Sequence, residues 1–136
     1  MTDARALRRS IDELLAEARA QLDRVEPASL AVEVDAGAVI VDIRPVEQRT
    51  RDGELPAAIV IDRNVLEWRL DPACPHHILE VDSYDTRLVI VCNEGYQSSL
   101  AAAELRQLGL HRATDLIGGF QAWMTFRAGR AVDDTD

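Results

Sequence analysis

The sequence contains no lysine, because all fifteen of its basic residues are arginine. This absence excludes enzymes that form a Schiff base on a lysine and nucleotide-binding proteins that hold phosphates with a P-loop lysine. Acidic residues outnumber the arginines, and the net charge is −9. An acidic protein is poorly suited to non-specific binding of nucleic acid or of an anionic membrane, so we expect neither as a partner.

Long hydrophobic runs are also absent, and no apolar stretch approaches the roughly 20 residues that cross a bilayer. Residues 1–15 mix aspartate and arginine with apolar residues, which does not fit a secretory signal. We therefore expect a cytoplasmic protein. Its 136 residues, 47% hydrophobic and 29% charged, predict one compact globular domain. Cys74 and Cys92 are expected to be free thiols, although the sequence leaves a bond between them open.

Short apolar segments alternate with helical patterns along the chain. Apolar residues at spacings of three and four over residues 7–25 predict an amphipathic helix. Further helices are predicted at residues 29–36, 98–108 and 120–127, and buried strands at 38–43, 57–62, 87–92 and 114–117. This alternation predicts an α/β domain with a mostly parallel sheet.

We divide the chain into three parts. Residues 1–26 are predicted to be an amphipathic helical extension that packs on the domain, residues 27–130 the domain itself, and residues 131–136 an acidic tail.

The residue with the clearest chemical potential is Cys92, at the end of the strongest predicted strand. Ligand sites in open α/β sheets lie beyond the carboxyl ends of the strands. Gly95 follows in a loop that enters a helix, where backbone N–H groups and the helix dipole stabilise a thiolate. The alternative is that Cys92 is an ordinary small buried residue, and position alone makes the two readings about equal.

Five segments resemble, in order, those of the rhodanese-like sulfurtransferase family. Residues 92–98, CNEGYQS, resemble the active-site loop C-x-x-G-x-R-S. Residues 41–44 (VDIR), 53–58 (GELPAA), 61–72 (IDRNVLEWRLDP) and 118–123 (GGFQAW) resemble V-D-x-R, G-x-I-P-G-A, I-P-R-x-x-L-E-x and G-G-x-x-A-W. The resemblance covers roughly residues 26–127 and identifies the chain as a member of the family.

The resemblance implies a rhodanese-like α/β fold with a central, mostly parallel five-stranded sheet flanked by helices on both faces. It implies that Cys92 is the catalytic nucleophile, which takes a sulfane sulfur from a donor as a persulfide and passes it to a thiol or cyanide-like acceptor. No metal and no organic cofactor is expected. The donor is a small molecule or a protein-bound persulfide, and the residues expected to bind it are Asn93, Glu94, Gly95, Tyr96, Gln97, Ser98 and Arg63.

The loop departs from the family pattern at two positions. Gln97 stands where an arginine is usual, and Glu94 adds a negative charge. Because a cation suits a dianion such as thiosulfate, we expect thiosulfate to be a poor substrate.

Two other functions remain open. One is a sulfur carrier or persulfide-sensing module without turnover, which needs only the Cys92 loop. The other is a cysteine phosphatase or arsenate reductase, which the missing loop arginine disfavours, since phosphoryl transfer needs a cation.

Several other features receive structural interpretations. Residues 74–77, CPHH, do not have the spacing of a zinc site, so a surface loop is expected. Asp42 and Arg44 are read as a strand-end ion pair, and Trp68 and Trp123 as core aromatics.

Overall fold

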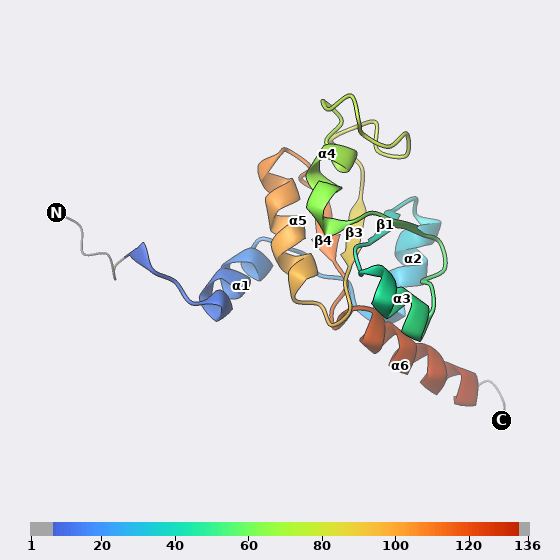
Figure 1. Cartoon of the computed structure of the whole chain (residues 1–136). Coiled ribbons are helices and arrows are strands. Elements are labelled where there is room, and N and C mark those ends of the chain that lie inside the picture. The colour runs from blue at the N-terminus through green and yellow to red at the C-terminus, as the bar shows by residue number, and fades with distance from the viewer. Residues whose placement is uncertain (1–6, 134–136) are drawn as a thin grey trace.

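The computed structural model describes residues 7–133, and four parallel strands form a sheet at its centre (Figure 1). The order is β2-β1-β3-β4, and the bounds are β1 Val39–Asp42, β2 Ala58–Val60, β3 Leu88–Val91 and β4 Ala113–Asp115. Every residue of β3 is buried, because the strand lies between β1 and β4 and is covered on both faces. The predicted α/β fold with a parallel sheet is confirmed.

Helices cover both faces of this sheet. On one face, α4 and α5 contribute Leu66 and Leu105 to the core, and on the other face α2 and α6 contribute Leu30 and Phe120. The helices are α1 Ile11–Ala20, α2 Leu30–Asp35, α3 Val46–Asp52, α4 Leu66–Leu70, α5 Gln97–Gln107 and α6 Gly119–Asp133, with 3-10 turns at Pro27–Ser29 and Arg63–Val65. None of the described helices is long and apolar enough to span a membrane.

The expected fifth strand is wrong for residues 7–133, which hold four. A single parallel bridge between Val25 and Leu116 lies beside β4. The Val25 N–H donates to the Asp115 carbonyl at 2.9 Å. Pairing stops there because Pro27 has no N–H to donate and begins a 3-10 turn instead.

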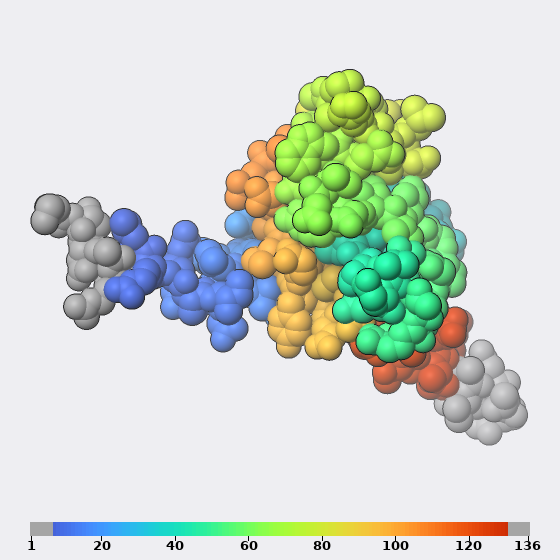
Figure 2. Space-filling model, in the orientation of Figure 1, coloured from blue at the N-terminus to red at the C-terminus, as the bar shows by residue number. Residues whose placement is uncertain are grey.

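The N-terminal helix is shorter than predicted. It begins after Ser10, whose Oγ accepts the Glu13 N–H at 3.0 Å, and it ends at Ala20. The chain then becomes extended, since Val25 bonds to β4 and cannot also continue a helix. α1 buries Leu15 and packs against α5, yet much of it protrudes from the body of the molecule (Figure 2).

The C-terminal helix is longer than predicted and continues to Asp133. The first half of the expected acidic tail, residues 131–133, is therefore helical. Residues 1–6 and 134–136 of the predicted extension and tail lie outside the described residues, and the division of the chain into three parts stays a prediction.

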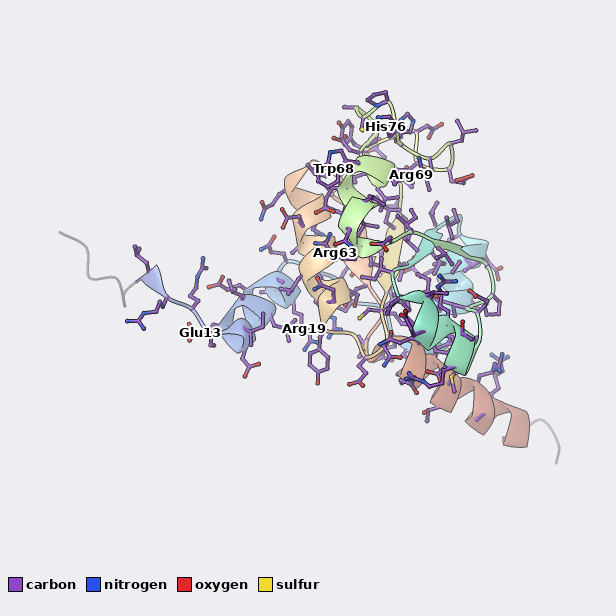
Figure 3. All side chains as sticks on the ribbon, viewed as in Figure 1. Glu13, Arg19, Arg63, Trp68, Arg69 and His76 are labelled. Carbon is purple, nitrogen blue, oxygen red and sulfur yellow. The ribbon has the colours of Figure 1, made fainter. Side chains whose placement is uncertain are left out.

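One of the two tryptophans was wrongly assigned to the core. Trp68 is 59% exposed and points away from the molecule (Figure 3). Leu66 and Leu70 are buried on the same short helix, and Trp68 lies between them on the opposite face. Trp123 does pack against the core, with its ring 5.4 Å from that of Phe120.

Candidate active site

Cys92 is the first residue after β3, at the carboxyl edge of the sheet. Cys92 is 8% exposed and belongs to the core cluster on the α4 and α5 face. Cys74 lies in the loop after α4, and both cysteines are free thiols, as predicted. The central position of β3 holds the Cys92 backbone firmly, because β3 is paired on both sides.

Backbone N–H groups surround the Cys92 sulfur. The Gly95 N–H donates to Sγ at 3.1 Å and the Ser98 N–H at 3.4 Å. The Cys92 thiol in turn donates to Ser98 Oγ at 3.3 Å. Ser98 belongs to the first turn of α5, so the positive end of the helix dipole also faces the sulfur. Two amides and a helix terminus therefore face the sulfur, an arrangement that suits negative charge on a bound or reacting group.

The backbone around the Cys92 sulfur requires glycine at two positions. Gly95 has φ of 87°, and a Cβ there would lie 2.8 Å from the Gly118 N. Gly119 has φ of 64°, and a Cβ there would lie 2.5 Å from the Cys92 carbonyl oxygen. Gly95 in the Cys92 loop and Gly119, the first residue of α6, thus let the first turn of α6 approach the loop closely.

Asn93 is tied to α6 on the other side of the loop. Its Oδ1 accepts from Gln121 Nε2 at 3.0 Å, and its carbonyl accepts the Gln121 N–H at 3.1 Å. The conformation of the loop is therefore set by α6 as well as by α5.

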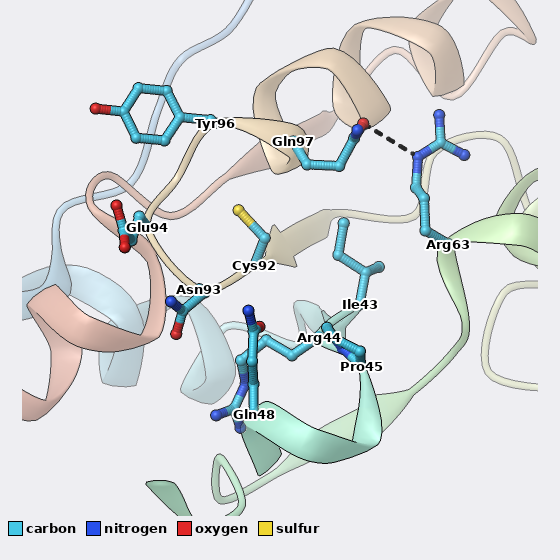
Figure 4. Close-up of a pocket in the computed structure, with 10 residues that line it drawn as sticks. All are labelled: Ile43, Arg44, Pro45, Gln48, Arg63, Cys92, Asn93, Glu94, Tyr96 and Gln97. Carbon is cyan, nitrogen blue, oxygen red and sulfur yellow. Dashed lines mark hydrogen bonds between the residues drawn. The ribbon is translucent and has the colours of Figure 1, made fainter. Parts of the chain in front are cut away.

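A cavity of about 450 Å³ opens beside the sulfur (Figure 4). Its walls come from the Cys92 loop, from the segment after β1 and from the turn before α4, and they comprise Ile43, Arg44, Pro45, Gln48, Arg63, Cys92, Asn93, Glu94, Tyr96 and Gln97. The cavity thus brings together most of the predicted site residues, while Gly95 and Ser98 lie behind the sulfur and contact it through their amides. That these residues act on a substrate stays a prediction.

Two arginines line the cavity, and both already have acidic partners. Arg44 forms a fully buried ion pair with Asp42 at 2.8 Å, which confirms the predicted strand-end pair. Arg63 pairs with Glu67 at 2.8 Å, and its Nε donates to Gln97 Oε1 at 3.4 Å (Figure 4). Since each cation is neutralised by a carboxylate, the cavity offers little net positive charge to an anion.

The cluster at residues 74–77 does not take part in this site. Arg69 donates to the His76 carbonyl, and His77 Nδ1 lies 2.6 Å from the Cys74 carbonyl oxygen, in the loop that follows α4. Within residues 7–133, no group of three or more His, Cys, Asp and Glu side chains could hold a metal ion.

Four residues directly behind the Cys92 loop were not predicted from the sequence, namely Arg19, Arg24, Ser99 and Asp115. Asp115 of β4 is fully buried and accepts hydrogen bonds from Ser98 Oγ at 2.8 Å and Ser99 Oγ at 2.7 Å. Arg24 pairs with Asp115 at 2.8 Å, and Arg19 donates to Ser99 Oγ at 3.1 Å. One signal was available, because a carboxylate in a short buried strand requires a partner.

Comparison with known proteins agrees with this architecture. The rhodanese-like domain family model matches residues 26–125. The thiosulfate sulfurtransferase GlpE of Stutzerimonas stutzeri is 32% identical over 100 residues, covering 74% of this chain and 83% of GlpE. The adenylyltransferase and sulfurtransferase UBA4 of Lodderomyces elongisporus is 32% identical over 89 residues, but the chain spans only 18% of the length of that relative.

One solved structure resembles nearly the whole chain. It is a protein of unknown function from Rhodopseudomonas palustris, described as a possible tyrosine phosphatase, with 30% identity and a TM-score of 0.77. The match covers 92% of this chain and 93% of the other, so it extends beyond the part that the family model covers. The chain belongs to the rhodanese-like domain family.

Proposed function

We propose that this protein is a sulfurtransferase that carries a sulfane sulfur as a persulfide on Cys92. The observation that supports this most directly is the position of the Cys92 sulfur. It accepts hydrogen bonds from two backbone N–H groups and lines a cavity. The family and the similarity to a thiosulfate sulfurtransferase point to the same chemistry. The N–H groups stabilise negative charge on the sulfur and need no metal or organic cofactor to do so.

The proposed reaction has two nucleophilic steps. The Cys92 thiolate attacks the outer sulfur of the donor, a new S–S bond forms at Sγ, and the leaving group departs with the electron pair of the bond that breaks. With thiosulfate, the leaving group is sulfite. A thiolate or cyanide then attacks the terminal sulfur of the persulfide, and the electron pair of that S–S bond returns to Cys92 as a thiolate.

The lining of the cavity favours a donor of low charge. Glu94 is exposed at the edge of the cavity, and Gln97 carries no charge. Arg63 forms an ion pair with Glu67. A small dianion such as thiosulfate would therefore bind mainly to the backbone amides and would be a poor substrate. A protein-bound or low-charge persulfide is the better candidate, held by Asn93, Tyr96 and the aliphatic part of Arg63.

The phosphatase alternative has some support, because a structural relative is described as a possible tyrosine phosphatase. Phosphoryl transfer needs a cation on the equatorial oxygens of the phosphate. Gln97 cannot supply it, and both arginines of the cavity already face carboxylates. We therefore retain sulfur transfer as the proposed function.

Intact mass spectrometry tests the proposal. The protein is incubated with thiosulfate and with low-charge persulfides, and we expect an adduct of one sulfur atom on Cys92 that a reducing agent removes. Multiple turnovers with an added thiol acceptor indicate an enzyme, and a stoichiometric adduct without turnover indicates a carrier. Phosphate release from an aryl phosphate with no sulfur adduct would instead support the phosphatase.

A further inference from the structure

The Cys92 loop is held from behind by two arginines of the N-terminal segment. Arg19 Nη2 donates to the Gly95 carbonyl at 2.8 Å, and Arg24 Nη2 donates to the same oxygen at 3.2 Å. Arg19 extends from α1 toward the start of α5 (Figure 3). Both arginines precede residues 26–125, which the family model matches, so this part of the chain adds to the active-site loop something that the matched domain does not contain.

Arg24 also neutralises the buried carboxylate behind the sulfur. Its Nε lies 2.8 Å from Asp115 Oδ1 and its Nη2 lies 3.2 Å from Oδ2. The Asp115 side chain is fully buried, and the Arg24 side chain is 16% exposed. Asp115 Oδ2 accepts from Ser98 Oγ, which in turn accepts from the Cys92 thiol. A continuous chain of contacts therefore links Arg24 to the reactive sulfur.

Ser98 has only one hydroxyl proton to donate. While Cys92 is a thiol, that proton bonds to Asp115, and the Ser98 oxygen accepts the thiol proton. Once Cys92 is a thiolate, the hydroxyl can rotate and donate to the sulfur instead. Asp115 still keeps Ser99 and Arg24 as partners after that rotation.

We propose that Arg24 and Asp115 are positioning residues that set the balance between thiol and thiolate at Cys92, acting through Ser98. The inference rests on the proposed role of Cys92 as the nucleophile. The Asp115 charge opposes the thiolate and holds the Ser98 proton away from it. Arg24 offsets that charge, and so it favours the thiolate although it does not touch the sulfur.

Other charged groups lie around the Cys92 loop and its cavity, and the test must leave them unchanged. Glu94 belongs to the loop, and Arg19 of α1 contacts the Gly95 carbonyl. The other groups are two ion pairs, Arg44 with Asp42 at the end of β1 and Arg63 with Glu67 of α4. Because none of them is altered, a shift in the titration of Cys92 reports on Arg24 and Asp115.

The proposal predicts opposite effects from removing the two members of one ion pair. Arg24→Gln leaves the Asp115 charge uncompensated and should disfavour the thiolate. Asp115→Asn removes that charge and releases the Ser98 hydroxyl, and it should favour the thiolate. If the Arg24–Asp115 pair only anchored the N-terminal segment, both variants would shift the thiol–thiolate balance in the same direction, because both break the pair.

The measurement is the rate of alkylation of Cys92 by iodoacetamide across pH, followed by peptide mass spectrometry in the full-length chain with Cys74→Ser. We expect the midpoint pH to fall in Asp115→Asn by roughly 0.5 to 2 pH units, because its carboxylate contacts Ser98 beside the sulfur. It should rise by a smaller amount in Arg24→Gln, because Arg24 lies one contact further from the sulfur. The double variant should lie between the two single variants.

Two further variants serve as controls, one that keeps the charge at position 24 and one elsewhere in the same segment. Arg24→Lys retains the positive charge and should stay near the parent midpoint, which decides the matter even if Asp115→Asn fails to fold. Asp23→Asn is the matched control, because Asp23 anchors the same segment to Arg87 and Arg106 without contacting the Cys92 loop. We expect no shift in Asp23→Asn.

Shifts of the same sign in Arg24→Gln and Asp115→Asn would overturn the inference. So would a shift in Arg24→Lys or Asp23→Asn as large as that in Arg24→Gln. The assay needs only the Cys92 thiol and no sulfur donor. A protein that shows the opposite shifts but transfers no sulfur would refute the proposed function and leave this inference standing.

Discussion

Glu67 controls how much positive charge the cavity presents, and removing its charge should improve the use of an anionic donor. Glu67 holds Arg63 at 2.8 Å, and the two side chains are 23% and 30% exposed. In Glu67→Gln, Arg63 keeps its place at the cavity wall but loses its counter-charge. We expect the KM for thiosulfate to fall and kcat/KM to rise.

The size of the effect follows from the charge and its surroundings. A unit charge about 5 Å from Arg63 gains roughly 0.8 to 3.3 kcal/mol at effective dielectric constants of 80 to 20. Because the pair is partly exposed, solvent screening places the gain near the lower end. We therefore expect an increase in kcat/KM of about three- to tenfold, which shrinks as salt is raised.

Steady-state assays with thiosulfate and cyanide, at low and high salt, measure this effect. Glu80→Gln is the control, because Glu80 is exposed, does not line the cavity and changes the net charge equally. Equal gains in Glu67→Gln and Glu80→Gln would mean that only the overall charge matters. No gain in either would mean that the loop amides alone bind the anion, and the reasoning about Arg63 would be refuted.

Three further predictions concern the nucleophile, the loop and the N-terminal segment. Cys92→Ser should abolish sulfur transfer and leave the thermal melting temperature nearly unchanged, whereas Cys74→Ser should alter neither; activity that survives in Cys92→Ser would exclude it as the nucleophile. Gly95→Ala should lose about 1 to 3 kcal/mol of stability in urea unfolding, because alanine resists the positive φ; a variant as stable and active as wild type would contradict this. Burial would by itself raise the pKa of Asp23, but the hydrogen bond and charge of Arg87, with Arg106, outweigh it, so the pKa lies below its ordinary value. Asp23 therefore stabilises the fold above about pH 4, and this contribution is lost as pH falls through the lowered pKa. Urea unfolding at neutral pH and near pH 3 should show a smaller loss of stability in Asp23→Asn than in wild type, and equal losses would argue against the assignment.

Local patterns in the sequence were sufficient for the central strand β3 and for the place of Cys92 at its end. The β-branched run at residues 87–92 predicts a buried strand, and β3 is buried along its whole length. The loop after it could be predicted because its chemistry is contained in seven consecutive residues, from Cys92 to Ser98. Gly95 marks the turn, and the helical pattern that follows marks the helix N-terminus that faces the sulfur.

It was harder to predict which face of a short helix is buried and where a helix ends. Trp68 is apolar and large, which favours the core, yet Leu66 and Leu70 already occupy the inward face of α4 and leave Trp68 exposed. The predicted helix at residues 7–25 was also too long, because α1 ends at Ala20. Its apolar spacing continues to Val25, but Val25 forms a bridge with Leu116 instead.

The class of fold, the family resemblance and the candidate nucleophile could all be predicted from the sequence, because each depends on neighbours along the chain. The charges that surround the nucleophile could not, since they come together only when the chain folds. Arg24 lies 91 positions before Asp115 in sequence, and Arg19 lies 76 positions before Gly95. No periodicity or spacing connects residues so far apart. They meet because α1 packs on α5 and because Val25 pairs beside β4, and a buried carboxylate there must have a cation within reach.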